Sequence, residues 1–217
     1  AGQLTAAHGV QAEVVPLDLG LEDAPARLHQ IVRDRGWTID VLVNNAGYGV
    51  WGDFTAAPWD RLRSMLQVDI VALTRLTHLF APEMAARKQG WILQVASIGA
   101  FQPCPTYAAY CAAKSYVLSF GEALAYELAG AGVKVCVLSP GYTETEFLAV
   151  AGQKQTWYQR AFAMTSRDVA RIGLRALLKG RRSVVPGWSN AFGAWSVRFL
   201  PRTWAAAIAA RTMRNEG

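Results

Sequence analysis

The sequence lacks the signals of several common classes of protein. Its three cysteines show no C-x-x-C spacing, so we expect no metal site and a reduced, cytoplasmic setting. No basic run is longer than Arg181-Arg182, so the net charge of +6 does not indicate nucleic-acid binding. The opening residues have neither the basic start nor the apolar run of a signal peptide. Because the chain starts with Ala1 rather than methionine, we expect a fragment that begins within a longer protein.

The composition is that of a folded protein with a substantial core. The 217 residues are 52% hydrophobic and 18% charged, which suits one globular domain over residues 1–217. One uncharged window, residues 91–113, is long enough to span a bilayer. Gly99, Pro103 and Pro105 interrupt this window, so we expect a buried strand, a loop and the start of a helix there instead.

Apolar β-branched runs alternate with helical segments along the chain. We predict strands at residues 12–17, 40–43, 91–96, 134–138 and 183–185. We predict helices at residues 24–35, 58–87, 107–129 and 166–178, with Pro58 in a first turn and Ser166 as a cap. This order of elements predicts an α/β fold with a parallel sheet.

The loops after three of these strands carry small and polar residues. One strand is followed by Asn44-Asn45-Ala46-Gly47, the next by Ser97, and a third by Pro140-Gly141-Tyr142-Thr143. Ligands of open parallel sheets bind outside the carboxyl ends of the strands. We therefore expect the three loops to meet at a single crevice.

Ser97, Tyr110 and Lys114 together favour carbonyl chemistry. Tyr110 and Lys114 are four residues apart, so a helix places the phenol and the ammonium on one face. A free tyrosine has a pKa of about 10, and a neighbouring positive charge lowers it toward the working pH of a general acid or base. Ser97 precedes this pair and can hold a substrate oxygen in place.

Taken in order, these motifs resemble the short-chain dehydrogenase/reductase family, and within it the DltE-like branch of single-domain reductases. The resemblance covers most of the chain and rests on Asn44-Asn45-Ala46-Gly47, Ser97, Tyr110-x-x-x-Lys114 and Pro140-Gly141-x-Thr143-x-Thr145. It implies a Rossmann-like, doubly wound parallel sheet. It also implies an oxidoreductase that interconverts a ketone and a secondary alcohol, with NADP as the cofactor and NAD as the other possibility.

The resemblance assigns a role to each member of the triplet. Tyr110 would be the general acid/base that exchanges a proton with the substrate oxygen. Lys114 would lower the pKa of Tyr110 and bind the ribose on the nicotinamide side of the cofactor. Ser97 would hydrogen-bond the same substrate oxygen and fix it for hydride transfer from the cofactor.

The same resemblance implies a set of cofactor-binding residues. They are Asp18, Asn44, Ala46, Gly47, Pro140, Gly141, Thr143 and Thr145, together with Tyr110 and Lys114. The acidic residue would lie beside the adenine ring, the small residues would permit close approach of the backbone, and the proline-glycine pair would form the nicotinamide wall. Which of the two threonines reaches the carboxamide or the phosphates stays open.

The chain departs from the family pattern in two places. Asp69 stands where the family usually has an asparagine that anchors a water leading to the lysine. An ionised aspartate cannot donate a hydrogen bond, and its charge would oppose lowering the pKa of Tyr110. A purely local hydrogen-bonding role at a helix kink is the other interpretation of Asp69. No G-x-x-x-G-x-G turn occurs, so we expect this chain to lack the family's first strand, phosphate-binding turn and second strand.

Other interpretations compete with the enzyme. Each motif alone also fits an ordinary turn or a local hydrogen bond, and only the four motifs in family order favour the functional interpretation. A non-catalytic relative that binds a ligand or partner is the alternative, motivated by Asp69 and the absent turn. A serine hydrolase is disfavoured, because Val95-Ala96-Ser97-Ile98-Gly99 lacks the first glycine of a nucleophile elbow.

The residues after Thr145 are expected to form the part of the site that binds the substrate. Residues 146–163 would cover an apolar small molecule, with candidate lining residues Phe147, Leu148, Trp157, Tyr158 and Phe162. Residues 188–217 form an aromatic and basic tail. For this tail we favour packing against the domain or a second subunit over contact with a membrane surface. The family resemblance further implies a homodimer or homotetramer.

Overall fold

The main sheet has four parallel strands. The computed structural model describes residues 1–213, except for the side chains of residues 157, 158 and 161. The strands lie in the order β1-β2-β3-β6 and span Val41–Asn44, Gly90–Val95, Val133–Leu138 and Ser183–Val184. A separate two-stranded parallel sheet joins β4 (Thr143–Glu144) to β5 (Met164–Thr165).

Helices connect the strands and extend beyond the last of them. From the N-terminus they are α1 Gly2–His8, α2 Ala24–Asp34, α3 Trp59–Leu66, α4 Leu73–Ala86, α5 Ala108–Glu127, α6 Phe147–Ala151, α7 Trp157–Phe162, α8 Ser166–Leu178, α9 Trp188–Ser196 and α10 Arg202–Met213. A π-helix, Gln67–Ala72, joins α3 to α4, and a short 3-10 turn, Val197–Phe199, joins α9 to the segment before α10.

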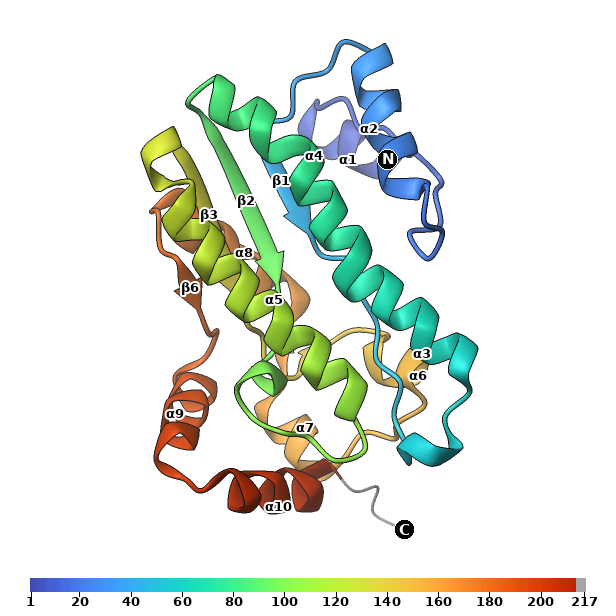
Figure 1. Cartoon of the computed structure of the whole chain (residues 1–217), viewed down its shortest axis with the longest axis vertical. Coiled ribbons are helices and arrows are strands. Elements are labelled where there is room, and N and C mark those ends of the chain that lie inside the picture. The colour runs from blue at the N-terminus through green and yellow to red at the C-terminus, as the bar shows by residue number, and fades with distance from the viewer. Residues whose placement is uncertain (214–217) are drawn as a thin grey trace.

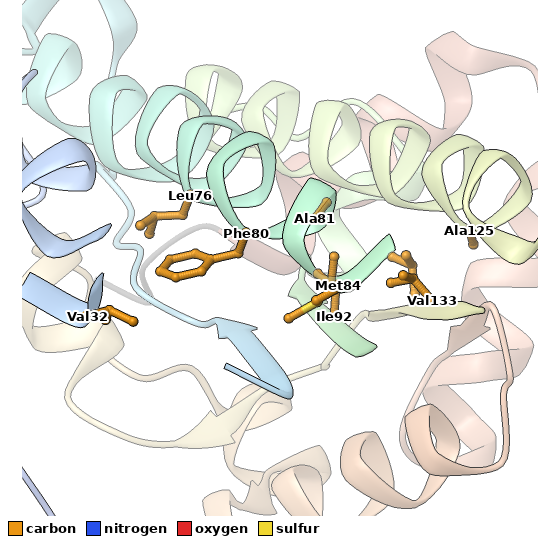
Figure 2. Packing of buried hydrophobic residues seen from close by; sticks show 9 residues of the cluster. Val32, Leu76, Phe80, Ala81, Met84, Ile92, Ala125 and Val133 are labelled. Atoms are coloured by element: carbon orange, nitrogen blue, oxygen red, sulfur yellow. The ribbon is translucent and has the colours of Figure 1, made fainter. Parts of the chain in front are cut away.

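Helices cover both faces of the main sheet (Figure 1). On one face, Met84 of α4 packs with Ile92 of β2 and Val133 of β3, beneath α4 and α5 (Figure 2). On the other face, Leu93 of β2 packs with Leu177 of α8. Because neighbouring residues of a strand point to opposite faces, Ile92 and Leu93 enter different cores. The predicted α/β fold with a parallel sheet is confirmed.

Most predicted elements are present, and one predicted cap is wrong. The predicted helix over residues 58–87 runs as α3, the π-helix and α4, in spite of Pro82 inside α4. At the start of α8 the Thr165 hydroxyl, not Ser166, accepts a hydrogen bond from the backbone N–H of Asp168 at 3.1 Å. Thr165 is the residue with extended backbone that precedes the helix, and this geometry lets its oxygen reach an unpaired amide.

The predicted strand at residues 12–17 is not formed. This segment has no regular structure, and Pro16 removes one of its amide donors. A strand needs a neighbour to complete its hydrogen bonds, and within the described residues β1 pairs with β2 alone. Val41 and Val43 of β1 are 43% and 45% exposed accordingly. The sheet therefore ends at β1 in the described part of the chain.

The uncharged window 91–113 contains β2, a 3-10 turn at Ile98–Phe101 and the start of α5, as predicted. Among the described helices, none combines the length and the apolar character needed to cross a bilayer.

Candidate active site

A large cavity lies at the carboxyl ends of β1, β2 and β3. It has a volume of about 1080 Å³, and Ser97, Tyr110 and Lys114 all line it. The loop after β2 carries Ser97, whereas α5 carries Tyr110 and Lys114 one turn apart. The expectation that residues distant in the sequence meet at this edge of the sheet is therefore confirmed for the triplet.

Ser97 is held by the turn that follows β2. Its backbone is extended, and its hydroxyl oxygen accepts a hydrogen bond from the backbone N–H of Gly99 at 3.1 Å. The same side chain interacts favourably with the Tyr110 side chain and works to lower its pKa. These contacts fix the hydroxyl beside the phenol, where both groups can meet one substrate oxygen.

Tyr110 lies in an aromatic environment. Its ring centroid is 5.2 Å from that of Phe147 and 5.7 Å from that of Tyr107. Burial raises the pKa of Tyr110, and the negative charge of Asp69 raises it further, while the interaction with Ser97 works in the opposite direction. The phenol is therefore a proton donor in this arrangement rather than a phenolate.

Lys114 is paired with Asp69 inside the protein. The Lys114 ammonium Nζ lies 3.2 Å from Oδ2 of Asp69, with side chains that are 5% and 0% exposed. Nζ also donates to the backbone carbonyl of Val95 at 3.2 Å, and it lies 5.6 Å from the ring centroid of Tyr110. The Asp69 charge raises the pKa of Tyr110, as expected for an aspartate at this position. That Lys114 lowers the pKa of Tyr110 stays a prediction.

The π-helix between α3 and α4 explains how Asp69 reaches the site. Asp69 lies inside this wider turn, and its Oδ1 accepts a hydrogen bond from the backbone N–H of Tyr48 at 3.1 Å. Burial raises the pKa of Asp69, and the Lys114 charge and the Tyr48 amide partly offset that rise. Asp69 therefore ties the π-helix, the loop after β1 and α5 together, which goes beyond a local role at a helix kink. A π-helix of this kind is frequent at functional sites.

The ion pair of Asp69 and Lys114 leaves little room for a side chain at Gly47. A Cβ atom at Gly47 would lie 2.8 Å from Oδ1 of Asp69 and 3.0 Å from Nζ of Lys114. Gly47 was predicted to allow close approach of the backbone to a cofactor, and the structure adds that it makes room for this ion pair.

The predicted cofactor residues fall into two groups. Gly47, together with Pro140, Gly141, Thr143 and Thr145, lines the cavity. Asp18, Asn44 and Ala46 are not among the lining residues. The Asn44 amide is buried and donates to Thr77 at 2.9 Å and to Gln94 at 3.0 Å, and Asp18 accepts from the backbone N–H of Gly20. Their predicted cofactor contacts stay predictions, and the contacts described for Asn44 and Asp18 are structural.

The predicted substrate cover contributes to the cavity in part. Phe147 and Leu148 line it, whereas Phe162 is not among the lining residues. Trp157 and Tyr158 were also predicted to line the pocket, but their side chains lie outside those described.

Sequence reasoning missed a group of polar residues that line the cavity, Tyr107, Gln153 and Gln159. Tyr107 donates to Oε1 of Gln153 at 2.8 Å, and Gln159 donates to the same oxygen at 3.1 Å. Gln153 in turn donates to the backbone carbonyl of Met213, which connects the cover to α10. No sequence motif identifies these glutamines, because their hydrogen bonds join segments that are far apart in the sequence.

A parallel sheet with helices on both faces, and a serine, a tyrosine and a lysine at its carboxyl edge, defines a Rossmann-like protein of the oxidoreductase type. The chain belongs to the short chain dehydrogenase family, whose profile matches residues 1–156. The resemblance inferred from the motifs is thereby confirmed, and the DltE-like branch stays a prediction.

Known proteins resemble the chain over most of its length. An uncharacterized oxidoreductase of Myxococcus xanthus is 27% identical over 205 residues, which cover 94% of this chain and 79% of that protein. The inactive hydroxysteroid dehydrogenase-like protein 1 of Mus musculus is 30% identical over 88% of this chain and 58% of its own. The chain thus spans little more than half of the mouse relative.

Among solved structures, a short-chain dehydrogenase from Sphingobium yanoikuyae in complex with NADPH is similar. It superposes with a TM-score of 0.79 at 25% identity, over 92% of this chain and 79% of that one. The similarity extends the family relationship to the three-dimensional fold.

Proposed function

We propose that this chain is the catalytic part of an NADP(H)-dependent oxidoreductase that interconverts a ketone and a secondary alcohol on an apolar small molecule. The observation that carries the proposal is the meeting of Ser97, Tyr110 and Lys114 on one cavity wall. Family membership and the NADPH bound to the Sphingobium enzyme support the choice of cofactor. NAD is the other candidate cofactor.

The side chains divide the work as follows. The Tyr110 hydroxyl donates its proton to the substrate oxygen during reduction and takes it back during oxidation. The Ser97 hydroxyl donates a hydrogen bond to the same oxygen and fixes its position. Lys114 supplies a buried positive charge beside both groups, and Asp69 holds that ammonium in place. The nicotinamide, when bound, supplies or accepts the hydride.

The residues present fit the nicotinamide half of such a cofactor. Pro140, Gly141, Thr143 and Thr145 line the cavity on the side of β3, and the cavity is large enough for a cofactor portion together with a substrate. The sequence has no G-x-x-x-G-x-G turn for the pyrophosphate. This chain's own residues therefore account for the reacting half of the site.

The cavity wall favours an apolar substrate. Tyr107, Tyr110 and Phe147 form an aromatic group beside the reacting hydroxyls, and Leu148 and Val150 continue the wall. Charged sugars would leave polar groups unpaired against these rings. A bulky ketone or its alcohol is the substrate class that we propose.

Activity with nicotinamide cofactors tests the proposal directly. Oxidation of NADPH and NADH should be followed by the loss of absorbance of the reduced nicotinamide, with a series of aliphatic, cyclic and aromatic ketones. We expect turnover of bulky ketones with NADPH and weaker turnover of polyhydroxylated substrates. A full-length protein that is folded and oxidises neither cofactor with any ketone would contradict the proposal.

Replacement of Asp69 by asparagine should change the pH dependence of activity. The carboxylate raises the pKa of Tyr110, so Asp69→Asn should lower that pKa and leave the Lys114 charge unbalanced. For alcohol oxidation, which needs the phenolate, the half-maximal rate should therefore occur at a lower pH than in the unaltered protein. Asp60→Asn, which removes an exposed carboxylate from α3, should leave the profile unchanged. A profile that does not move, or moves to higher pH, would contradict the role of Asp69.

One observation favours a second candidate function, a non-catalytic relative that binds a ligand or partner. Asp69 neutralises the lysine of the triplet, and the mouse relative carries the description inactive. The ketone series decides between the two candidates, because a binding protein would take up NADPH without oxidising it. The predicted homodimer or homotetramer and the cytoplasmic location stay predictions.

A further inference from the structure

The two C-terminal helices expose large aromatic side chains and bury small ones. On α9 and the 3-10 turn after it, Trp188, Phe192, Trp195 and Phe199 are 85%, 62%, 53% and 69% exposed. Their spacing of four, three and four residues places them along one side of the segment. Trp195 contacts Phe192 and Phe199, with ring centroids 5.9 Å and 4.8 Å apart.

Helix α10 continues the pattern. Trp204 and Ile208 are exposed, whereas Ala205 and Ala209 are buried. The expected packing of these aromatic residues against the domain is therefore wrong, and the inner sides of α9 and α10 explain why. Packing against a second subunit, the other half of that expectation, stays a prediction. Small residues on those sides, such as Ala194 and Ala209, form part of the cavity wall, so the bulky side chains are left outside.

We call the exposed aromatic and aliphatic side chains of these two segments the aromatic face: Trp188, Phe192, Trp195, Phe199, Trp204 and Ile208. α9 and α10 lie at one end of the molecule, away from α1 and α2 at the N-terminus (Figure 1). Exposing this much apolar surface to water costs free energy, so we expect the aromatic face to bind a partner or a membrane.

The charged residues on the 3-10 turn and α10 are all positive. Arg198, Arg202 and Arg211 are exposed on the same two segments. From residue 169 to residue 213 the sequence has no aspartate or glutamate, and its cations are Arg171, Arg175, Lys179, Arg181, Arg182, Arg198, Arg202 and Arg211. The partner must therefore supply negative charge. In a symmetric contact made by α9, the 3-10 turn and α10 alone, a second copy of this chain would supply no acidic side chain.

We propose that the aromatic face binds the surface of an anionic lipid bilayer. In membrane-bound proteins, tryptophan rings are enriched at the level of the lipid headgroups. Arginine side chains form ion pairs with the anionic phosphates at the same level. Both kinds of side chain project from the same two short segments. The chain would lie on the bilayer rather than cross it, since no described helix can span one.

The site cavity reaches the aromatic face. Ile208 is 51% exposed and also lines the cavity, as do Val197 and Leu200 between the exposed aromatic residues. An apolar substrate dissolved in the bilayer would therefore be close to the cavity mouth. This consequence rests on the proposed function, whereas lipid binding itself does not.

Sedimentation with vesicles tests the proposal. The full chain should pellet with vesicles of phosphatidylcholine and phosphatidylserine, and less with phosphatidylcholine alone. Binding to the anionic vesicles should fall as salt rises, because screening weakens the attraction of the arginines. Brominated acyl chains should quench tryptophan fluorescence of the bound protein, which reports insertion of the rings.

Two variants separate the charges from the rings. Arg198→Gln with Arg202→Gln should weaken partition to anionic vesicles by about fivefold per arginine. Trp188→Ser with Phe199→Ser should weaken it by about tenfold or more and reduce the quenching. Arg33→Gln and Trp59→Ser, which change exposed residues of α2 and α3, are the matched controls and should bind as the unaltered chain does. All variants alter exposed side chains, so circular dichroism should show an unchanged fold.

Three results would overturn the proposal. The unaltered chain could stay in the supernatant with anionic vesicles, or the aromatic double variant could bind as well as the controls. Alternatively, the unaltered chain could fail to bind vesicles, and light scattering could show that it is a dimer. The variant with both Trp188→Ser and Phe199→Ser would then be a monomer. That last result would assign the aromatic face to a second copy of the chain.

Discussion

Replacement of Tyr110 by phenylalanine is expected to lower the rate of carbonyl reduction by about 100-fold to 10,000-fold, the range that a positioned general acid contributes. The change removes the hydroxyl and leaves the ring against Phe147 and Tyr107, so packing should be kept. The turnover number should fall while NADPH binding, measured by fluorescence, changes little. Steady-state kinetics on a ketone that the unaltered protein reduces provide the measurement.

Tyr116 offers a matched control on the same helix. Its hydroxyl bonds to Thr74 at 3.0 Å, and it is 39% exposed and outside the cavity lining. Tyr116→Phe should keep nearly all of the activity. If Tyr110→Phe retained more than about a tenth of the unaltered rate, proton transfer by the phenol would not be a main contributor.

Replacement of Lys114 by methionine is expected to lower the free energy of unfolding by about 3–5 kcal/mol. The change leaves the Asp69 carboxylate without its cation at a position that is fully buried. A buried charge without a partner is expensive, although Asp69 would keep its hydrogen bond from Tyr48. Urea unfolding followed by circular dichroism provides the measurement, and carbonyl reduction should be lost as well.

A double variant separates the ion pair from simple loss of packing. Lys114→Met combined with Asp69→Asn removes both charges, so it should recover most of the stability that Lys114→Met loses, but not the activity. Lys179→Met, at an exposed position after α8, should change stability by less than about 0.5 kcal/mol. A double variant that is no more stable than Lys114→Met would show that the carboxylate is not the source of the cost.

Four strands and the long helices were predictable because each has its own local pattern. The apolar run ending at Val95 and the i, i+4 pair Tyr110 and Lys114 need no distant information to be recognised. The strand at residues 12–17 was not predictable, because a β-branched run becomes a strand only when another strand accepts its hydrogen bonds. β1 pairs with β2 alone within the described residues, so nothing there pairs with the segment.

The sequence by itself determined the family and the alternation of strands and helices, because these depend on residue type and order. It also led to the proposal of Ser97, Tyr110 and Lys114 as the reacting group. Only the tertiary structure decided the electrostatics of that group. It placed Asp69 3.2 Å from Lys114 through the π-helix, and it turned the tail's aromatic residues outward because the inner sides of α9 and α10 line the cavity. Both outcomes depend on contacts between distant segments, since burial and the distance between charges are set by packing rather than by local sequence.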